Sequence, residues 1–121
     1  MADYNHVTLV GRLINEPEAK AVSDDRLRTG FTLAINRPYK DNNGKSVSDF
    51  FNIVAWGKLA EICKEYVKKG EDLLVDGRIQ SRSYEQDNEK KWITEIIAES
   101  LSFLGRKNGN GKPKSEKEAV K

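Results

Sequence analysis

The chain has 121 residues, of which 37% are hydrophobic and 33% charged, a composition that suits one globular domain of roughly 100 residues with some additional polar sequence. One cysteine and one histidine are too few soft ligands for a zinc site, so we expect no metal and no cofactor. There is no apolar run of membrane-spanning length and no signal peptide pattern at the start, so we expect a cytoplasmic location and no membrane contact.

The formal net charge of +2 is distributed unevenly along the chain. Residues 105–121 hold six basic and two acidic residues, whereas the rest of the chain holds 15 basic and 17 acidic residues. Net charge alone therefore does not indicate nucleic-acid binding by the folded part. Whether the folded part binds nucleic acid has to be judged from the positions of its charged and aromatic residues.

Three strands are expected in the first half of the chain. Residues 7–13 are a strand candidate interrupted by Gly11, which is typical of a bulge or bend in a curved sheet. From Leu27 apolar and polar residues alternate, which predicts a strand with one solvated face. Asn43-Gly44 then indicates a hairpin, because both residues tolerate positive φ, and a third strand should occupy about residues 48–56.

One helix and two further strands are expected after that. Apolar residues at helical spacing, followed by Gly70, predict a helix over about residues 58–69. Alternation resumes around Gly77, and residues 92–104 form a last strand after a polar turn at 85–91. This order predicts an all-β, five-stranded Greek-key barrel of the OB type, with the helix between the third and fourth strands.

The predicted domain covers residues 1–105. Residues 106–121 have no apolar period and are expected to form a disordered basic tail.

Aromatic and basic residues alternate along the predicted strands and loops. Four aromatic residues are candidates for exposure outside the core: Tyr39, Phe50, Trp56 and Tyr84. The basic residues near them are Arg37, Lys40, Lys58, Arg78 and Arg82. Every base has a π face that can stack on an aromatic ring for roughly 1–3 kcal/mol, while Lys and Arg contact phosphates. This mixture predicts a sequence-independent site for a single strand of nucleic acid.

The alternative is that these aromatic residues belong to the core or to a subunit contact. Phe50 and Phe51 are adjacent and point to opposite faces, so one of them is buried. Neither face of this strand is cleanly polar, so periodicity leaves stacking and burial equally open for Phe50 and Trp56. Tyr39 and Tyr84 have polar neighbours and are expected to be exposed.

No catalytic constellation is found, so we expect the chain not to be an enzyme. His6 has no Ser or Cys beside it in a local motif and is expected to be a surface histidine. A nuclease of the OB type would need convergent acids, and Asp49, Asp72 and Asp76 do not obviously converge.

Four motifs between Asn5 and about Gly105 resemble the bacterial single-stranded DNA-binding protein family: Asn5–Leu13, Glu16–Glu18, Trp56–Glu61 with Tyr66–Gly70, and Val75–Tyr84. The resemblance implies an OB fold and a homotetramer in the bacterial cytoplasm, with DNA wrapped over the subunits. The family's stacking positions fall on the four aromatic residues named above, which favours exposure of Phe50 and Trp56. Lys58 and Arg82 match positions that are usually basic in the family.

The resemblance also implies a subunit interface. The first strand joins subunits in the family, so we expect the interface at Val7, Leu9, Gly11 and Arg12. An exposed strand edge is prone to such pairing.

The end of the sequence departs from the family pattern. Typical members end in an acidic tip with a terminal Pro-Phe that recruits replication and repair enzymes, whereas this sequence ends with residues 118–121, Glu-Ala-Val-Lys. Recruitment of such partners is therefore doubtful. The basic tail either contacts DNA, which would raise the salt dependence of binding, or stays solvated.

The sequence thus predicts a non-catalytic protein that binds and protects single-stranded DNA during replication, recombination and repair. A rival hypothesis is an OB-fold protein-interaction module that uses the same surface. The interleaving of aromatic and basic residues favours nucleic acid.

Overall fold

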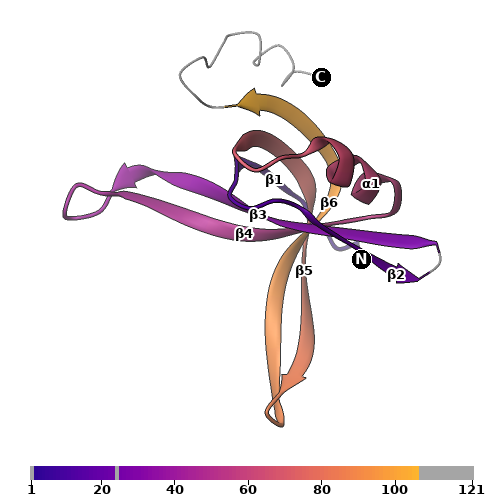
Figure 1. Ribbon diagram of the computed structural model, residues 1–121. Coiled ribbons are helices and arrows are strands. Elements are labelled where there is room, and N and C mark those ends of the chain that lie inside the picture. Colours follow the sequence, from indigo (N-terminus) through magenta and orange to yellow (C-terminus); the bar gives the residue numbers. More distant parts are fainter. Residues whose placement is uncertain (1, 24, 107–121) are drawn as a thin grey trace.

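The computed structural model describes residues 2–23 and 25–106. The elements are β1 (Val7–Leu13), β2 (Glu18–Ser23), β3 (Arg26–Lys40), β4 (Ser46–Trp56), α1 (Gly57–Tyr66), β5 (Glu71–Gln86) and β6 (Glu89–Arg106). The strands form one sheet in the order β1-β5-β6-β4-β3-β2, which pairing between β1 and β3 closes into a barrel (Figure 1). The expected OB-type barrel with one helix is confirmed, and residues 107–121 of the predicted tail lie outside the described residues.

Five strands close the barrel, as expected, and the sheet has one further strand, β2, outside the closed ring. β2 pairs antiparallel with β3, from Glu18 opposite Gly30 to Ser23 opposite Arg26. All six β2 residues are exposed, so backbone pairing alone specifies the strand. Without a buried face it shows no hydrophobic alternation, which is why the sequence pattern did not reveal it.

Two element boundaries also differ from expectation. The hairpin of β5 and β6 stays paired as far as Gln86 opposite Glu89, so its turn is only Asp87 and Asn88 rather than residues 85–91. Both turn residues have positive φ, as a tight two-residue hairpin turn requires. The helix ends at Tyr66 rather than near residue 69, because Val67 is extended and its N–H bonds to the carbonyl of Cys63.

The core lies inside the barrel and beneath α1. Its largest fully buried side chains come from the strands and the helix: Leu13, Leu33, Ile53, Leu73, Val75, Thr29 and Cys63. The Thr29 hydroxyl donates a 2.8 Å hydrogen bond to the carbonyl of Ala60 and so ties α1 to β3. Burial raises the pKa of the Cys63 thiol to about 11, so it stays neutral and acts as a small apolar core residue. Within the described chain no helix is long and apolar enough to cross a membrane.

Few backbone pairs close the barrel. β1 meets β3 only at Arg12 and Leu13, and β4 meets β6 in a short parallel pairing of Ile53 with Ile96 and Val54 with Ile97.

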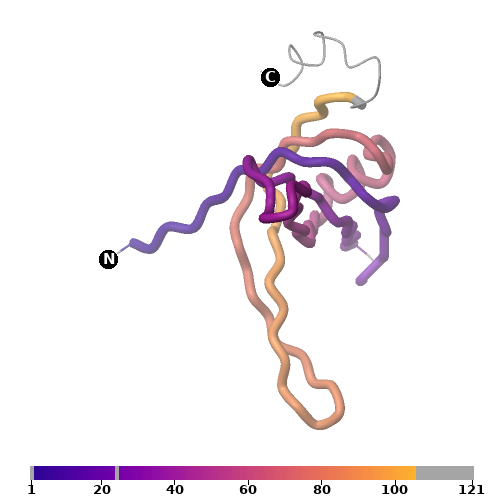
Figure 2. Tube along the Cα trace, turned by 90° about the vertical axis from the view of Figure 1, so that its left-hand side faces the viewer, coloured from indigo at the N-terminus to yellow at the C-terminus, as the bar shows by residue number. Residues whose placement is uncertain are grey.

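The long strands continue beyond the barrel as two-stranded arms. The ends of β3 and β4 form one arm, and the tip of the β5–β6 hairpin forms another, which projects far from the core (Figures 1 and 2). Residues 81–92 of this hairpin are exposed throughout, so its tip has no core of its own.

Backbone crowding at Gly77 generates a stability prediction. A Cβ atom at Gly77 would lie 2.0 Å from the carbonyl oxygen of Ile97, whereas one at Gly30 would meet nothing nearer than 3.7 Å. Since the Ile97 backbone cannot yield without disturbing β6, we expect Gly77→Ala to lower the free energy of unfolding by about 2 kcal/mol or more. Urea titration at one protein concentration measures this, with Gly30→Ala as the control that should stay near the wild-type value. Equal stability of the two variants would contradict the crowding.

Candidate nucleic-acid interface

Strand alternation gives β4 an inward and an outward face. Phe51, Ile53 and Ala55 point inward, with Ile53 and Ala55 fully buried. Phe50 is 62% exposed on the outward face, and Trp56 lies half-buried on the same face. Cross-strand packing, rather than periodicity, thus decides which phenylalanine is in the core.

An open groove of about 270 Å³ lies over the outward faces of β3 and β4 and reaches the β5–β6 hairpin. Asn52 and Val54 of β4 line it, between Phe50 and Trp56 in the strand. Thr32 of β3 lies opposite Asn52, and its hydroxyl is 3.5 Å from the Asn52 side-chain oxygen. The groove is therefore lined by the part of β4 that lies between two predicted stacking residues.

Trp56 has a cation beside its ring. The guanidinium carbon of Arg26 lies 4.3 Å from the ring centroid, within the range of a cation–π interaction. Arg26 therefore places a positive charge over one face of the Trp56 ring.

Tyr84 and Arg82 lie on the same face of the β5–β6 hairpin. Tyr84 is 41% exposed and opposite Lys91, while Arg82 is opposite Ile93. Residues two apart in a strand share a face, so Tyr84, Arg82 and Lys91 extend the face that carries Ile93 and reaches the groove.

Tyr39 is separated from the other predicted stacking residues. It is 59% exposed, and its hydroxyl lies 3.5 Å from Arg37, which forms two hydrogen bonds to Asp49. Since Asp49 and Phe50 are neighbours and point to opposite faces, Tyr39 is held beside Asp49 rather than beside Phe50.

Three predicted phosphate-binding arginines already have acidic partners: Arg37 pairs with Asp49, Arg78 with Glu99 and Arg82 with Glu95. Hydrogen bonds to these carboxylates hold the pKa values of Arg37 and Arg82 above the usual range. Lys40 and Lys58 are exposed, and among residues 2–23 and 25–106 no acidic partner is seen for either. The site therefore combines two open lysines with arginines that are fixed in place.

Sequence reasoning missed Trp92 on the β5–β6 hairpin. Trp92 is 64% exposed, with Lys90 5.4 Å from its ring. It lies opposite Ser83, so it points to the face away from Tyr84. The polar run of Lys90 and Lys91 just before it was the sequence signal for exposure.

The expected subunit strand has one open edge. β1 pairs with β5 from Val7 to Arg12, and among the described residues its other edge meets β3 only at Arg12 and Leu13. Of the four expected interface residues, Val7 and Leu9 pack against the core, Gly11 lies against the β3 backbone and Arg12 contacts Asp72 at 3.8 Å. The exposed side chains of this strand are instead Thr8 and Val10.

The acids considered for metal binding are kept apart. Asp76 accepts hydrogen bonds from Thr8 and Ser100 in the barrel, whereas Asp49 pairs with Arg37 toward the β3–β4 arm. In the part of the chain that the structure describes, no group of three potential metal ligands is found.

Comparison with known proteins gives consistent matches. A family model described as the single-strand binding protein family matches residues 4–104. The chain is similar to a single-stranded DNA-binding protein of Bacillus cereus, 44% identical over 108 residues that cover 88% of this chain and 64% of that protein. It is 42% identical to single-stranded DNA-binding protein 2 of Streptococcus agalactiae, over 84% of this chain and 77% of the relative. The chain thus spans a little under two thirds of the length of the Bacillus cereus protein and about three quarters of the length of the Streptococcus agalactiae protein.

A solved structure has the same fold. It is described as a Plasmodium falciparum SSB complex with single-stranded DNA, and it aligns with a TM-score of 0.75 at 29% identity, covering 85% of this chain and 96% of that one.

The pair of Arg37 and Asp49 predicts an acid-sensitive contribution to stability. Its hydrogen bonds lower the Asp49 pKa below the usual 3.8, so the unfolded chain binds a proton at this site before the folded chain does. Stability from this pair is therefore present above about pH 4 and lost as the pH falls through the lowered value. We expect Asp49→Asn to lose less stability than the wild type between pH 5 and pH 2, as measured by urea unfolding. Glu85→Gln, which removes an exposed acid elsewhere, should keep the wild-type pH dependence; the same dependence in Asp49→Asn would contradict the role of the pair.

Proposed function

Because the chain belongs to the single-strand binding protein family, we propose that it binds and protects single-stranded DNA without regard to base sequence, in replication, recombination and repair. No catalytic step is part of this function. The cytoplasmic location expected from the sequence is kept as part of the same proposal.

The shared outward face of Phe50 and Trp56 supports this function most directly. The residues between them in β4 line a groove that Arg28 and Arg82 also line, and Arg28 is paired with Trp56, so stacking and phosphate contacts are available close together. Aromatic stacking tolerates any base because every base has a π face. The lack of a deep, enclosed pocket in this groove suits a strand that lies along the surface.

Stacking predicts a specific loss of affinity. We expect Phe50→Ala to weaken binding of a fluorescently labelled oligo-dT by about 5- to 150-fold, the equivalent of roughly 1–3 kcal/mol. Tyr66→Ala removes an equally exposed aromatic residue on α1 and should bind like the wild type. In Trp92→Phe, Trp56 is the only tryptophan left of the two in the chain, and its fluorescence should be quenched by oligo-dT.

Duplex DNA of equal length is the second ligand in this experiment. Binding to oligo-dT alone supports the single-strand function. Equal affinity for duplex and oligo-dT, or no binding to either, would contradict it and favour the protein-interaction module.

We further propose a homotetramer in which the open edge of β1 forms the dimer contact. Continuation of the sheet into a second copy would satisfy the unpaired backbone groups of this edge, and the exposed Val10 would lie at the contact. Recruitment of replication or repair proteins is not part of this proposal.

The proposed tetramer predicts a molecular mass in solution, and a substitution at the β1 edge should lower it. For a chain of 13.7 kDa, light scattering should give about 55 kDa for four copies. We expect Val10→Lys to lower this mass, because a charge at a strand edge opposes pairing. Val22→Lys, on the exposed strand β2, should leave the mass unchanged, and a wild-type mass near 14 kDa would exclude the tetramer.

A further inference from the structure

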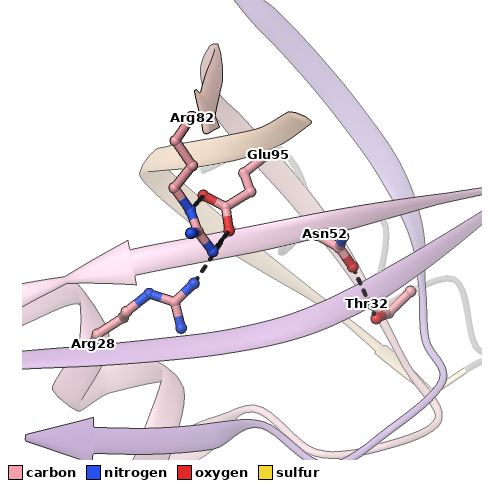
Figure 3. A network of polar contacts seen from close by, with 5 residues as sticks. All are labelled: Arg28, Thr32, Asn52, Arg82 and Glu95. Atoms are coloured by element: carbon pink, nitrogen blue, oxygen red, sulfur yellow. Dashed lines mark hydrogen bonds and ion pairs between the residues drawn. The ribbon is translucent and has the colours of Figure 1, made fainter. Parts of the chain in front are cut away.

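A buried carboxylate in the groove holds two arginines from distant parts of the chain. The Glu95 side chain is only 6% exposed. Arg82 donates to both of its oxygens, through Nε at 3.1 Å and Nη2 at 3.0 Å. Arg28 of β3 donates through Nη2 at 3.2 Å to the oxygen Oε2 (Figure 3). One acid thus fixes the positions of two guanidinium groups.

This cluster keeps a net positive charge. Two guanidinium groups and one carboxylate leave a charge of one, and each guanidinium carries five N–H donors, of which Glu95 takes only one or two. The remaining donors lie in a groove that is open to solvent. Most of the hydrogen-bonding capacity of both arginines is therefore available to a ligand with several acceptor oxygens.

Arg28 also lies next to the stacking residues. It is the cross-strand neighbour of Trp56, and Cβ atoms of such neighbours are roughly 5 Å apart on the same face. A Cβ atom at Gly30 would be 3.7 Å from Nη1 of Arg28, so the guanidinium lies along the groove floor above this glycine. A nucleotide stacked on Trp56 would place its phosphate group near this floor.

We propose that Arg28 and Arg82 form a clamp for one phosphate of the bound strand and that Glu95 is the positioning residue of this clamp. The clamp rests on the proposed binding of single-stranded DNA. Arginine binds phosphate through pairs of parallel N–H donors, which requires the guanidinium planes to be held in a fixed orientation. Glu95 supplies that orientation from below, so neither flexible side chain has to be ordered when DNA arrives.

The positioning role and simple electrostatics predict opposite changes in DNA affinity when the Glu95 charge is removed. A carboxylate near phosphates repels them, so if charge alone mattered, removal of the Glu95 charge would strengthen DNA binding. If Glu95 holds the arginines in place, its removal weakens binding although the net positive charge of the groove increases.

The first test measures the phosphate contact of Arg28. Labelled oligo-dT is titrated into the full chain at several salt concentrations, and the slope of log K against log salt is compared. We expect Arg28→Met to bind about tenfold more weakly, with a slope smaller in magnitude by about 0.7, the value for one phosphate contact on a single strand. Arg28→Lys keeps the charge but not the planar fork, so it should bind more weakly with a nearly unchanged slope. Lys64→Met on α1 should match the wild type.

The second test addresses Glu95. We expect Glu95→Gln to weaken binding about three- to tenfold without reducing the slope, and to have no further effect in an Arg28→Met/Arg82→Met background. Tighter or unchanged binding by Glu95→Gln would overturn the positioning role, and an unchanged slope in Arg28→Met would overturn the clamp. If Glu95→Gln does not fold, by circular dichroism, the two Arg28 variants still decide whether the clamp exists. Failure of the wild type to bind oligo-dT would instead overturn the proposed function itself.

Discussion

The short parallel pairing of β4 with β6 is the contact on which the groove depends. Only Ile53 with Ile96 and Val54 with Ile97 are paired there, yet this contact places Glu95, the residue before Ile96, beside the outward face of β3 and β4. On the other edge of β6, Gly77 of β5 leaves space for the Ile97 backbone. The pairing that helps to close the barrel therefore also assembles the proposed binding surface, from residues 43 positions apart in the chain.

Acidic side chains as well as basic side chains organise the candidate interface. Arg37, Arg78 and Arg82 each face a carboxylate, and only Glu95 among these acids is deeply buried. Exposed ion pairs contribute little to stability, so apart from the small acid-sensitive contribution of Arg37 with Asp49, these two pairs chiefly restrict where the guanidinium groups of Arg37 and Arg78 point. The Glu95 cluster differs, because a buried acid without its arginines would be costly. At Glu95, the stability of the fold and the orientation of the two arginines thus depend on the same ion pairs.

Periodicity and motif order were enough to predict the barrel class, the helix and its place, and most strand positions. They failed at β2, whose six exposed residues carry no buried face, and at the β5–β6 turn, where polar residues 85–91 are mostly strand. The face of Phe50 depended on cross-strand packing, which a single strand does not encode. The cluster of Arg28, Arg82 and Glu95 joins residues 67 positions apart, and so local patterns contain no sign of it.

The length of the arms can change independently of the fold of the barrel. At the β5–β6 tip both faces are solvated and pairing runs without interruption to Gln86 and Glu89, so residues could be inserted or deleted there in cross-strand pairs without changing any side chain of the barrel. Each added pair would lengthen the arm by roughly 3.3 Å. Evolution can therefore adjust how far the arm reaches from the barrel through arm length alone, while selection on the core preserves the same barrel.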